Sequence, residues 1–147
     1  MVRQAISQCL LNTDRAFITA VASDRSRTCI VSTVEVGRAA ETAAAEFLEA
    51  TGFQIIDRNW HNRWCEIDII AARGGLVHIV EVKYRTNIRY GYASEYISRD
   101  KSARLIRAAL AWTQARRYNG PYQIDAIAVE GSISRPSITH LENVITA

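Results

Sequence analysis

Two acidic residues fall in a stretch whose pattern is that of a β-hairpin. Residues 65–72 and 76–83 are rich in β-branched side chains, and Gly74-Gly75 between them is typical of a two-residue turn. Pairing the two strands outward from this turn places Asp68 opposite Glu81, on the same face of the hairpin. We therefore expect two carboxylates to be neighbours across the strands.

Such a pair of like charges destabilises a sheet unless a cation lies between the carboxylates or one of them is protonated. Mg²⁺ and Mn²⁺ bind carboxylate oxygens while keeping water ligands, and a bound ion can polarise a phosphoryl oxygen and activate water. Lys83 follows Glu81 by two residues on the same face, where it would position that water or offset transition-state charge. The alternative is a surface hairpin in which Glu66, Lys83 and Arg85 form ordinary ion pairs.

Alternation along the two strands also predicts which side chains form the core. Ile70 and Ile79 share the face of the acids, whereas the opposite face is apolar apart from one histidine and must be core. Its members are Ile67, Ile69, Ala71, His78, Val80 and Val82. We interpret the histidine as a buried, hydrogen-bonded residue, and Asp125, later in the chain, as a strand-end residue paired with an arginine.

The elements around the hairpin follow from capping and turn signals. Ser32 to Glu35 has the capping-box pattern, and a helical spacing of small and apolar residues continues from there until Gly52. The other expected elements are a strand at 53–56, a polar stretch at 57–64 that is strand end plus loop, a helix at about 99–117, and strands at 122–129 and 137–141. This order predicts a mixed sheet with helices packed on it, of α/β or α+β class.

Length and composition set the broad class. The chain has 147 residues, of which 48% are hydrophobic and 22% charged, as in an ordinary globular protein. Residues 1–32 are weakly patterned and are treated as an N-terminal extension of uncertain order, followed by a single domain at 33–147. No apolar run approaches the roughly 20 residues of a membrane helix, and three scattered cysteines favour a reducing compartment. We therefore expect a cytoplasmic protein with no membrane partner.

A basic segment follows the hairpin. Nine basic and two acidic residues lie between Lys83 and Arg117, while the rest of the chain is net acidic. This distribution favours an anionic partner, nucleic acid first, although a solvated basic helix face is the alternative. The stretch 59–64 mixes tryptophans with a cation, which fits either single-strand or junction binding or two tryptophans packed over the sheet edge.

Asp68 and the run Glu81-Val82-Lys83, with Glu41 on the preceding helix, resemble the restriction-endonuclease-like PD-(D/E)XK nuclease superfamily. More closely, the chain resembles the YraN-like family of small bacterial proteins, described as predicted endonucleases related to archaeal-type Holliday-junction resolvases. The matching stretches are 37–44, 58–59, 66–71, 80–85, Lys101 and 123–125. Two residues depart from the pattern: Cys65 replaces a usual glycine, and Ile67 stands where the superfamily's name has proline.

The resemblance implies an α/β fold with a restriction-endonuclease-like mixed β-sheet flanked by helices. It also implies that Asp68 and Glu81 are metal ligands, with the Val82 carbonyl as a third ligand. Glu41 would be an accessory catalytic carboxylate that also helps to hold one or two metal ions. Lys83 would be the catalytic lysine. The cations expected to bind DNA phosphates are Arg85, Lys101, Arg104 and Arg107. On a helical wheel Lys101 lies at the edge of the apolar face, whereas Arg104 and Arg107 point away from it.

These residues lead to three hypotheses. The first is an endonuclease that uses Mg²⁺ or Mn²⁺ to hydrolyse phosphodiester bonds in duplex, branched or junction DNA. A homodimer would suit a two-fold junction, by analogy with relatives that cut junctions. The second is a non-catalytic nucleic-acid-binding module with the same fold. The third is a scaffold that binds a protein partner through exposed tryptophans.

Overall fold

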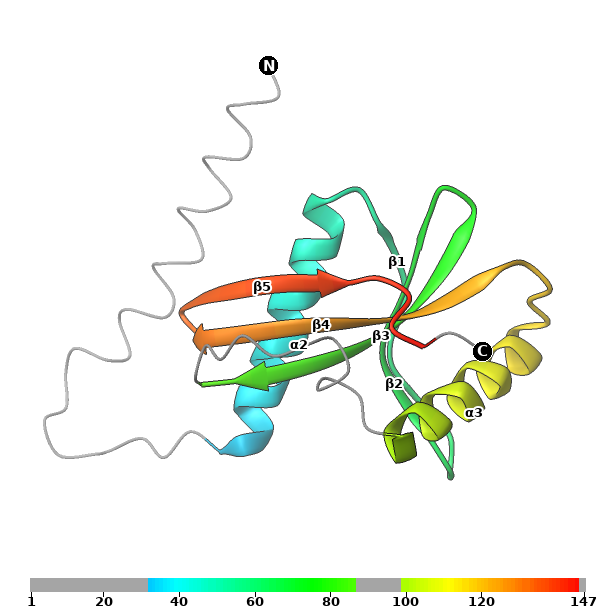
Figure 1. Ribbon diagram of the computed structural model, residues 1–147, viewed down its shortest axis with the longest axis horizontal. Coiled ribbons are helices and arrows are strands. Elements are labelled where there is room, and N and C mark those ends of the chain that lie inside the picture. Colours follow the sequence, from blue (N-terminus) through cyan, green and yellow to red (C-terminus); the bar gives the residue numbers. More distant parts are fainter. Residues whose placement is uncertain (1–31, 87–98, 146–147) are drawn as a thin grey trace, which may run out of the picture. The chain divides into compact units, whose positions relative to one another are not determined.

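The computed structural model describes residues 32–86 and 99–145. The extension expected at 1–32 lies outside the described residues except for Ser32, as does most of the loop before the second helix. The described elements are α2 (Thr33–Ala50), β1 (Gln54–His61), β2 (Glu66–Arg73), β3 (Leu76–Arg85), α3 (Arg99–Arg116), β4 (Tyr122–Ser132) and β5 (Arg135–Leu141) (Figure 1). Neither helix of this part is long and apolar enough to cross a membrane.

The strands form one mixed sheet in the order β1-β2-β3-β4-β5. Neighbours are antiparallel except β3 and β4, which are parallel and are connected through α3. A parallel pair needs such a crossover because the chain must return to the same end of the sheet. This α/β arrangement agrees with the expected restriction-endonuclease-like class. The strand expected at 53–56 and the strand end expected within 57–64 are one strand, β1, which continues to His61 and pairs there with Glu66.

The start of α2 confirms the capping box. The Ser32 hydroxyl accepts the Glu35 backbone N–H at 3.2 Å, and the Glu35 carboxylate accepts the Ser32 backbone N–H at 2.9 Å. At the other end, Thr51 donates to carbonyls of the last turn, and Gly52 follows with a φ of +89° that glycine adopts most easily. The helix therefore has the predicted bounds, and these bounds fix the position of Glu41 along it.

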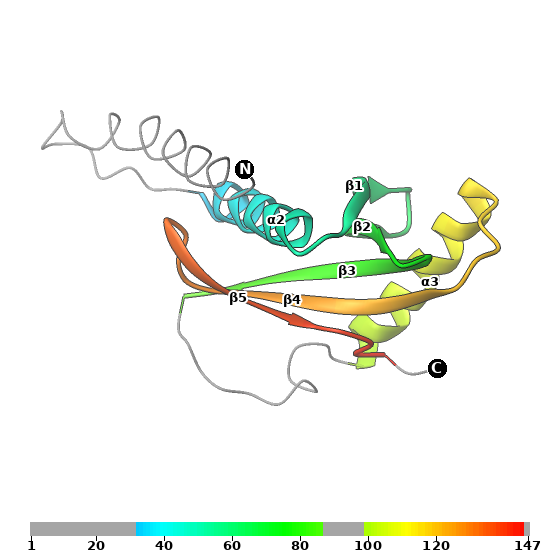
Figure 2. The ribbon, with the colours of Figure 1, turned by 90° about the horizontal axis from the view of Figure 1, so that it is seen from above.

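The two helices pack against different sides of the sheet. In Figure 2, α2 lies along one side of the long strands, and α3 lies near the end at which β3 and β4 begin. The core on the α2 side contains Leu48, Ile69, Ala71, Val80, Ile127 and Val129. The core on the α3 side contains Ile70, Val77, Ile79, Leu105, Trp112 and Ile124. Both faces of the hairpin are therefore core, because α3 also covers the face that carries Ile70 and Ile79.

The β2–β3 turn is the predicted one. Gly74 and Gly75 have φ values of +60° and +82°, the sign that a type I′ turn needs at both positions. The predicted register is confirmed from Arg73 opposite Leu76 up to Ile69 opposite Val80. The described pairing ends there, so Asp68 and Glu81 lie just beyond the last pair and do not form one themselves. Figure 1 shows β3 beginning beside β2 and then turning away to run along β4.

Candidate metal and nucleic-acid site

The hairpin strands part at Asp68. On β1, Asn59 lies between the residues paired with Ile67 and Ile69, and its φ of +52° is a left-handed conformation that asparagine tolerates well. Side-chain alternation fails at the same point, since Ile69 packs on the α2 side of the sheet and Ile67 on the α3 side. The expectation that Ile67 and Ile69 share a face is therefore wrong, because the strand turns over between them.

We call Asp68 and Glu81 the acid pair. Glu81 is buried and Asp68 half-buried, and Asp68 Oδ2 accepts the backbone N–H of Val82 at 2.8 Å. The Asp68 side chain thus accepts a hydrogen bond from β3 at the point where the backbone pairing of β3 with β2 has ended. Burial, and then the charge of Glu81, raise the pKa of Asp68 to about 7 in spite of this hydrogen bond. The site therefore combines burial with a second carboxylate, and both oppose ionisation of Asp68.

Lys101, in the first turn of α3, reaches the acid pair. Its Nζ lies 2.9 Å from Glu81 Oε1, and its charge lowers the pKa of Asp68 by less than Glu81 raises it. Arg104 and Arg107 are exposed on the same helix, away from its buried residues. The helix edge predicted for Lys101 therefore faces the acid pair, and the two arginines face solvent.

Glu41 approaches from α2. Its Oε2 accepts the side-chain amide of Asn59 at 2.6 Å, and its charge contributes to the raised pKa of Asp68. Arg58 forms a second bridge between β1 and α2, donating to the Thr42 hydroxyl at 3.1 Å. Asn59 thus both marks the parting of the strands and fixes the carboxylate of Glu41.

The strand beyond the acid pair carries two of the predicted cations. Lys83 and Arg85 follow Glu81 at two-residue steps, so they lie on the same side of β3. Both side chains are half-buried, and Arg85 is in register with Glu130, a buried acid on β4. Two cations therefore follow the acid pair along β3, and the second of them lies beside an acid of β4.

The chemistry of the acid pair suits a hard divalent cation. Two carboxylates in a partly buried position are the donors that Mg²⁺ and Mn²⁺ prefer. Within the described residues, Glu41 does not join Asp68 and Glu81 as a set of three carboxylates close enough to hold one ion. Direct metal ligation by Glu41 and by the Val82 carbonyl, both implied by the resemblance, therefore stays a prediction.

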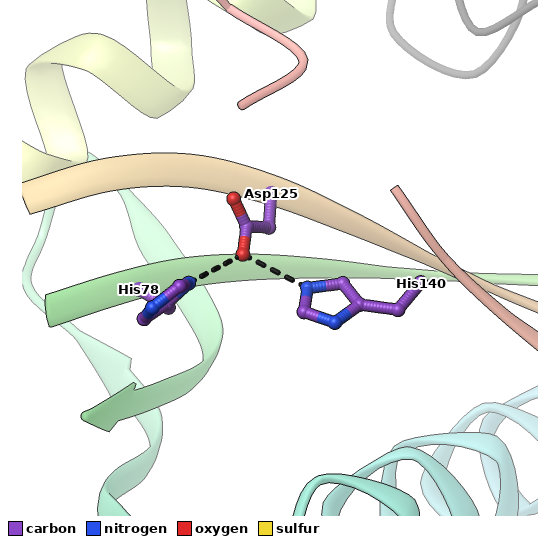
Figure 3. A group of neighbouring side chains, drawn as sticks. All are labelled: His78, Asp125 and His140. Atoms are coloured by element: carbon purple, nitrogen blue, oxygen red, sulfur yellow. Dashed lines mark hydrogen bonds and ion pairs between the residues drawn. The ribbon is translucent and has the colours of Figure 1, made fainter. Parts of the chain in front are cut away.

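A second polar group, which we call the histidine cluster, consists of His78, Asp125 and His140 on β3, β4 and β5 (Figure 3). Asp125 is completely buried, and its Oδ2 accepts a ring N–H from His78 at 2.7 Å and from His140 at 2.8 Å. Its Oδ1 accepts the Gln123 amide and the Asn143 backbone N–H, each at 2.8 Å. All four hydrogen bonds end on the carboxylate of Asp125.

The histidine cluster differs chemically from the acid pair. Burial opposes ionisation of Asp125, but the four hydrogen bonds outweigh it and lower its pKa below the ordinary value. Two ring nitrogens and a carboxylate oxygen within 4.8 Å are a donor set that transition metals accept, yet the protein already satisfies this carboxylate. We therefore interpret the cluster as a bond between three strands. The expected arginine partner of Asp125 is wrong, whereas His78 is hydrogen-bonded as expected.

The chain matches known proteins over most of its described part. The model of "Uncharacterised protein family UPF0102" matches residues 40–129, a range that contains the acid pair, Glu41 and Lys101. A UPF0102 protein of Leifsonia xyli subsp. xyli is 43% identical over 115 residues, covering 76% of this chain and 96% of the relative. A UPF0102 protein of Paenarthrobacter aurescens is 38% identical over 111 residues, covering 74% and 92%. The chain therefore belongs to the UPF0102 family, the YraN-like group that its sequence resembles.

Proposed function

We propose that the protein is a metal-dependent endonuclease that hydrolyses phosphodiester bonds in DNA. The observation that carries the proposal is the meeting of Asp68 and Glu81 where β2 and β3 part. Membership of a YraN-like family supports it, because the motif residues fall within the matched range. The basic segment that follows supplies cations for an anionic polymer.

In this proposal Asp68 and Glu81 hold Mg²⁺ or Mn²⁺, together with the Val82 carbonyl, and Glu41 adds negative charge nearby. A bound divalent ion supplies a Lewis acid for a phosphoryl oxygen and lowers the pKa of water. The amine of Lys83 orients the attacking water or offsets charge on the phosphate in the transition state. Lys101 holds Glu81 in place and offers a cation to the phosphate that is cut.

The DNA backbone would lie along the cations that flank the acid pair. Arg104 and Arg107 are exposed on α3, and Arg85 lies on β3 two residues after Lys83. Arginine suits this task because its planar guanidinium is always charged and binds phosphate oxygens in pairs. We place the reaction in the cytoplasm and include a homodimer as the form that would act on a two-fold junction.

A cleavage panel tests the proposal. Purified protein is incubated with blunt duplex, single-stranded, flap and four-way-junction DNA in Mn²⁺, in Mg²⁺ and in EDTA. We expect cleavage of at least one substrate with Mn²⁺, none in EDTA, and none by Asp68→Ala or Glu81→Ala, whereas Arg135→Ala on β5 serves as the matched active control. If the wild-type protein cuts none of these substrates with either metal, the proposal is wrong.

A non-catalytic DNA-binding module is the second candidate. The ion pair between Lys101 and Glu81 favours it, because one carboxylate of the acid pair already has a counter-charge in the protein. Titration calorimetry with Mn²⁺ and DNA binding at several salt concentrations separate the two. DNA binding that weakens steeply with salt, without any heat of Mn²⁺ binding, identifies the module.

A further inference from the structure

An open pocket of about 340 Å³ lies next to the acid pair, between the β1–β2 turn and the start of α3. It is lined by residues 61–66 of the turn and by Lys101, Arg104 and Leu105 of the helix. Its volume is at the lower end of the range for small-molecule sites. Lys101 lines the pocket and also contacts Glu81, so a single side chain separates the pocket from the proposed reaction site.

The turn presents an aromatic ring to this pocket. Trp64 is 79% exposed, whereas Trp60 packs against the core on the α3 side. The guanidinium carbon of Arg63 lies 4.8 Å from the centre of the Trp64 ring. A single exposed ring is ordinary on a protein surface, but this ring borders a pocket and has a cation over it. The packing expected of both tryptophans is therefore confirmed for Trp60 only, and Trp64 is free of the core.

Asn62 holds the turn in a defined shape. Its side-chain oxygen accepts the backbone N–H groups of Trp64 at 2.8 Å and Cys65 at 3.0 Å. Its own backbone N–H donates to the Cys65 carbonyl at 2.9 Å. These bonds order the backbone that carries Trp64, so a ligand does not have to order it on binding.

The charges around the pocket favour an anionic ligand. Arg63 and Arg104 are exposed cations on either side, Lys101 lies between them and the acid pair, and Glu66 is the one acid of the lining. A ligand that combines a flat ring with a phosphate suits a pocket lined by the Trp64 ring and by the cations of Arg63 and Arg104. A nucleotide is such a ligand. Inside duplex DNA the face of each base is covered by its neighbours, so away from the duplex ends only an unpaired base can stack on Trp64.

We propose that this pocket binds an unpaired nucleotide of DNA, with its base stacked on Trp64 and its phosphate held by Arg63 and Arg104. This inference rests on the proposed function and names its substrate class. The preferred DNA carries a single-stranded segment or branch point beside the phosphate that reaches the acid pair.

Binding without divalent metal tests this inference apart from cleavage. Fluorescence anisotropy in EDTA compares a labelled oligothymidylate with a blunt duplex of equal length. Trp64→Ala is expected to weaken single-strand binding about tenfold, as the loss of one base–aromatic stack would, and to change duplex binding less than about twofold. Trp64→Phe should retain most of the affinity, and Tyr122→Ala, which removes an exposed aromatic on β4, should retain all of it.

Two binding results overturn the inference, and so does one cleavage result. One is equal affinity of the wild-type protein and Trp64→Ala for single-stranded DNA. This result counts against the inference even if gel filtration shows that the substitution splits a dimer. The other is equal affinity of the wild-type protein for single strand and blunt duplex. Cleavage of blunt duplex as fast as of flap or junction DNA leaves the proposed function intact and also counts against this inference. If the wild-type protein cuts no DNA but Trp64→Ala still weakens single-strand binding, the result counts only against the proposed function.

Discussion

Asp68 and Asp125 lie in the same sheet, and the protein shifts their pKa values in opposite directions. Asp68 has one backbone hydrogen bond and an acidic neighbour, and its pKa is raised to about 7. Asp125 is more deeply buried, yet its four hydrogen bonds hold its pKa below the ordinary value. Burial alone therefore does not decide the charge of a carboxyl, because the donors supplied by the fold do.

The difference assigns different tasks to the two aspartates. Asp125 has its donors from three strands and stabilises the sheet through them. Asp68 has a single donor, the Val82 backbone N–H, and sits beside Glu81, so a cation from outside would complete its surroundings. The comparison thus favours the acid pair over the histidine cluster as the reaction site, although the histidine cluster holds three potential metal ligands.

The largest expected effect separates the two sites by catalysis. Asp68→Ala should lower the rate of Mn²⁺-dependent DNA cleavage by roughly 10³-fold, because it removes a proposed metal ligand. His140→Gln, a polar substitution in the histidine cluster, should leave the rate per folded molecule within about threefold. Initial rates on the best substrate of the panel, with folded fractions from circular dichroism, measure both. Reversal of the two effects would move the reaction site to the histidine cluster.

A smaller effect concerns the stability that Asp125 provides. Asp125→Asn places an amide among donors, so some of the four hydrogen bonds are lost in a buried position. We expect the free energy of unfolding to fall by about 3 kcal/mol at neutral pH, measured by urea denaturation. A loss below about 0.5 kcal/mol would show that the cluster does not join the strands.

The same substitution at Asp68 should act in the opposite direction. Since its folded pKa is raised above the ordinary value of an aspartate to about 7, the folded state binds the extra proton, and this group makes the metal-free protein less stable as pH rises from about 4 to about 7. Asp68→Asn removes that penalty and should raise the free energy of unfolding by about 2 kcal/mol at pH 8, and by roughly a third as much at pH 5. Urea denaturation in EDTA at both pH values provides the measurement, and a loss of stability at pH 8 contradicts the raised pKa.

The smallest effect is expected for a carboxylate nearer the surface. Asp57 on β1 forms an ion pair with Arg116 of α3, and the Arg116 side chain is 54% exposed. Asp57→Asn should change the free energy of unfolding by less than about 0.5 kcal/mol, because water screens such a pair. A change as large as that of Asp125→Asn would mean that charge outweighs burial in this fold.

Sequence reasoning succeeded where the structure depends on local rules. The Gly74-Gly75 turn fixes the hairpin register, and the capping box fixes the start of α2, since both involve residues close in the chain. It failed at Ile67, because the turn-over at Asp68 depends on Asn59 of another strand. The histidine cluster depends on parallel pairing of β3 with β4 across a whole helix, and its one local signal was an aspartate inside an apolar strand.

The most direct test of the central claim is the shift of the thermal unfolding midpoint by Mn²⁺ at pH 8. If the acid pair binds the ion, saturating Mn²⁺ should raise the midpoint of the wild-type protein by about 5 °C relative to EDTA. His140→Gln should keep this shift, and the double substitution Asp68→Asn with Glu81→Gln should lose it. A shift that survives the double substitution, or that disappears in His140→Gln alone, would contradict the assignment of the metal to the acid pair.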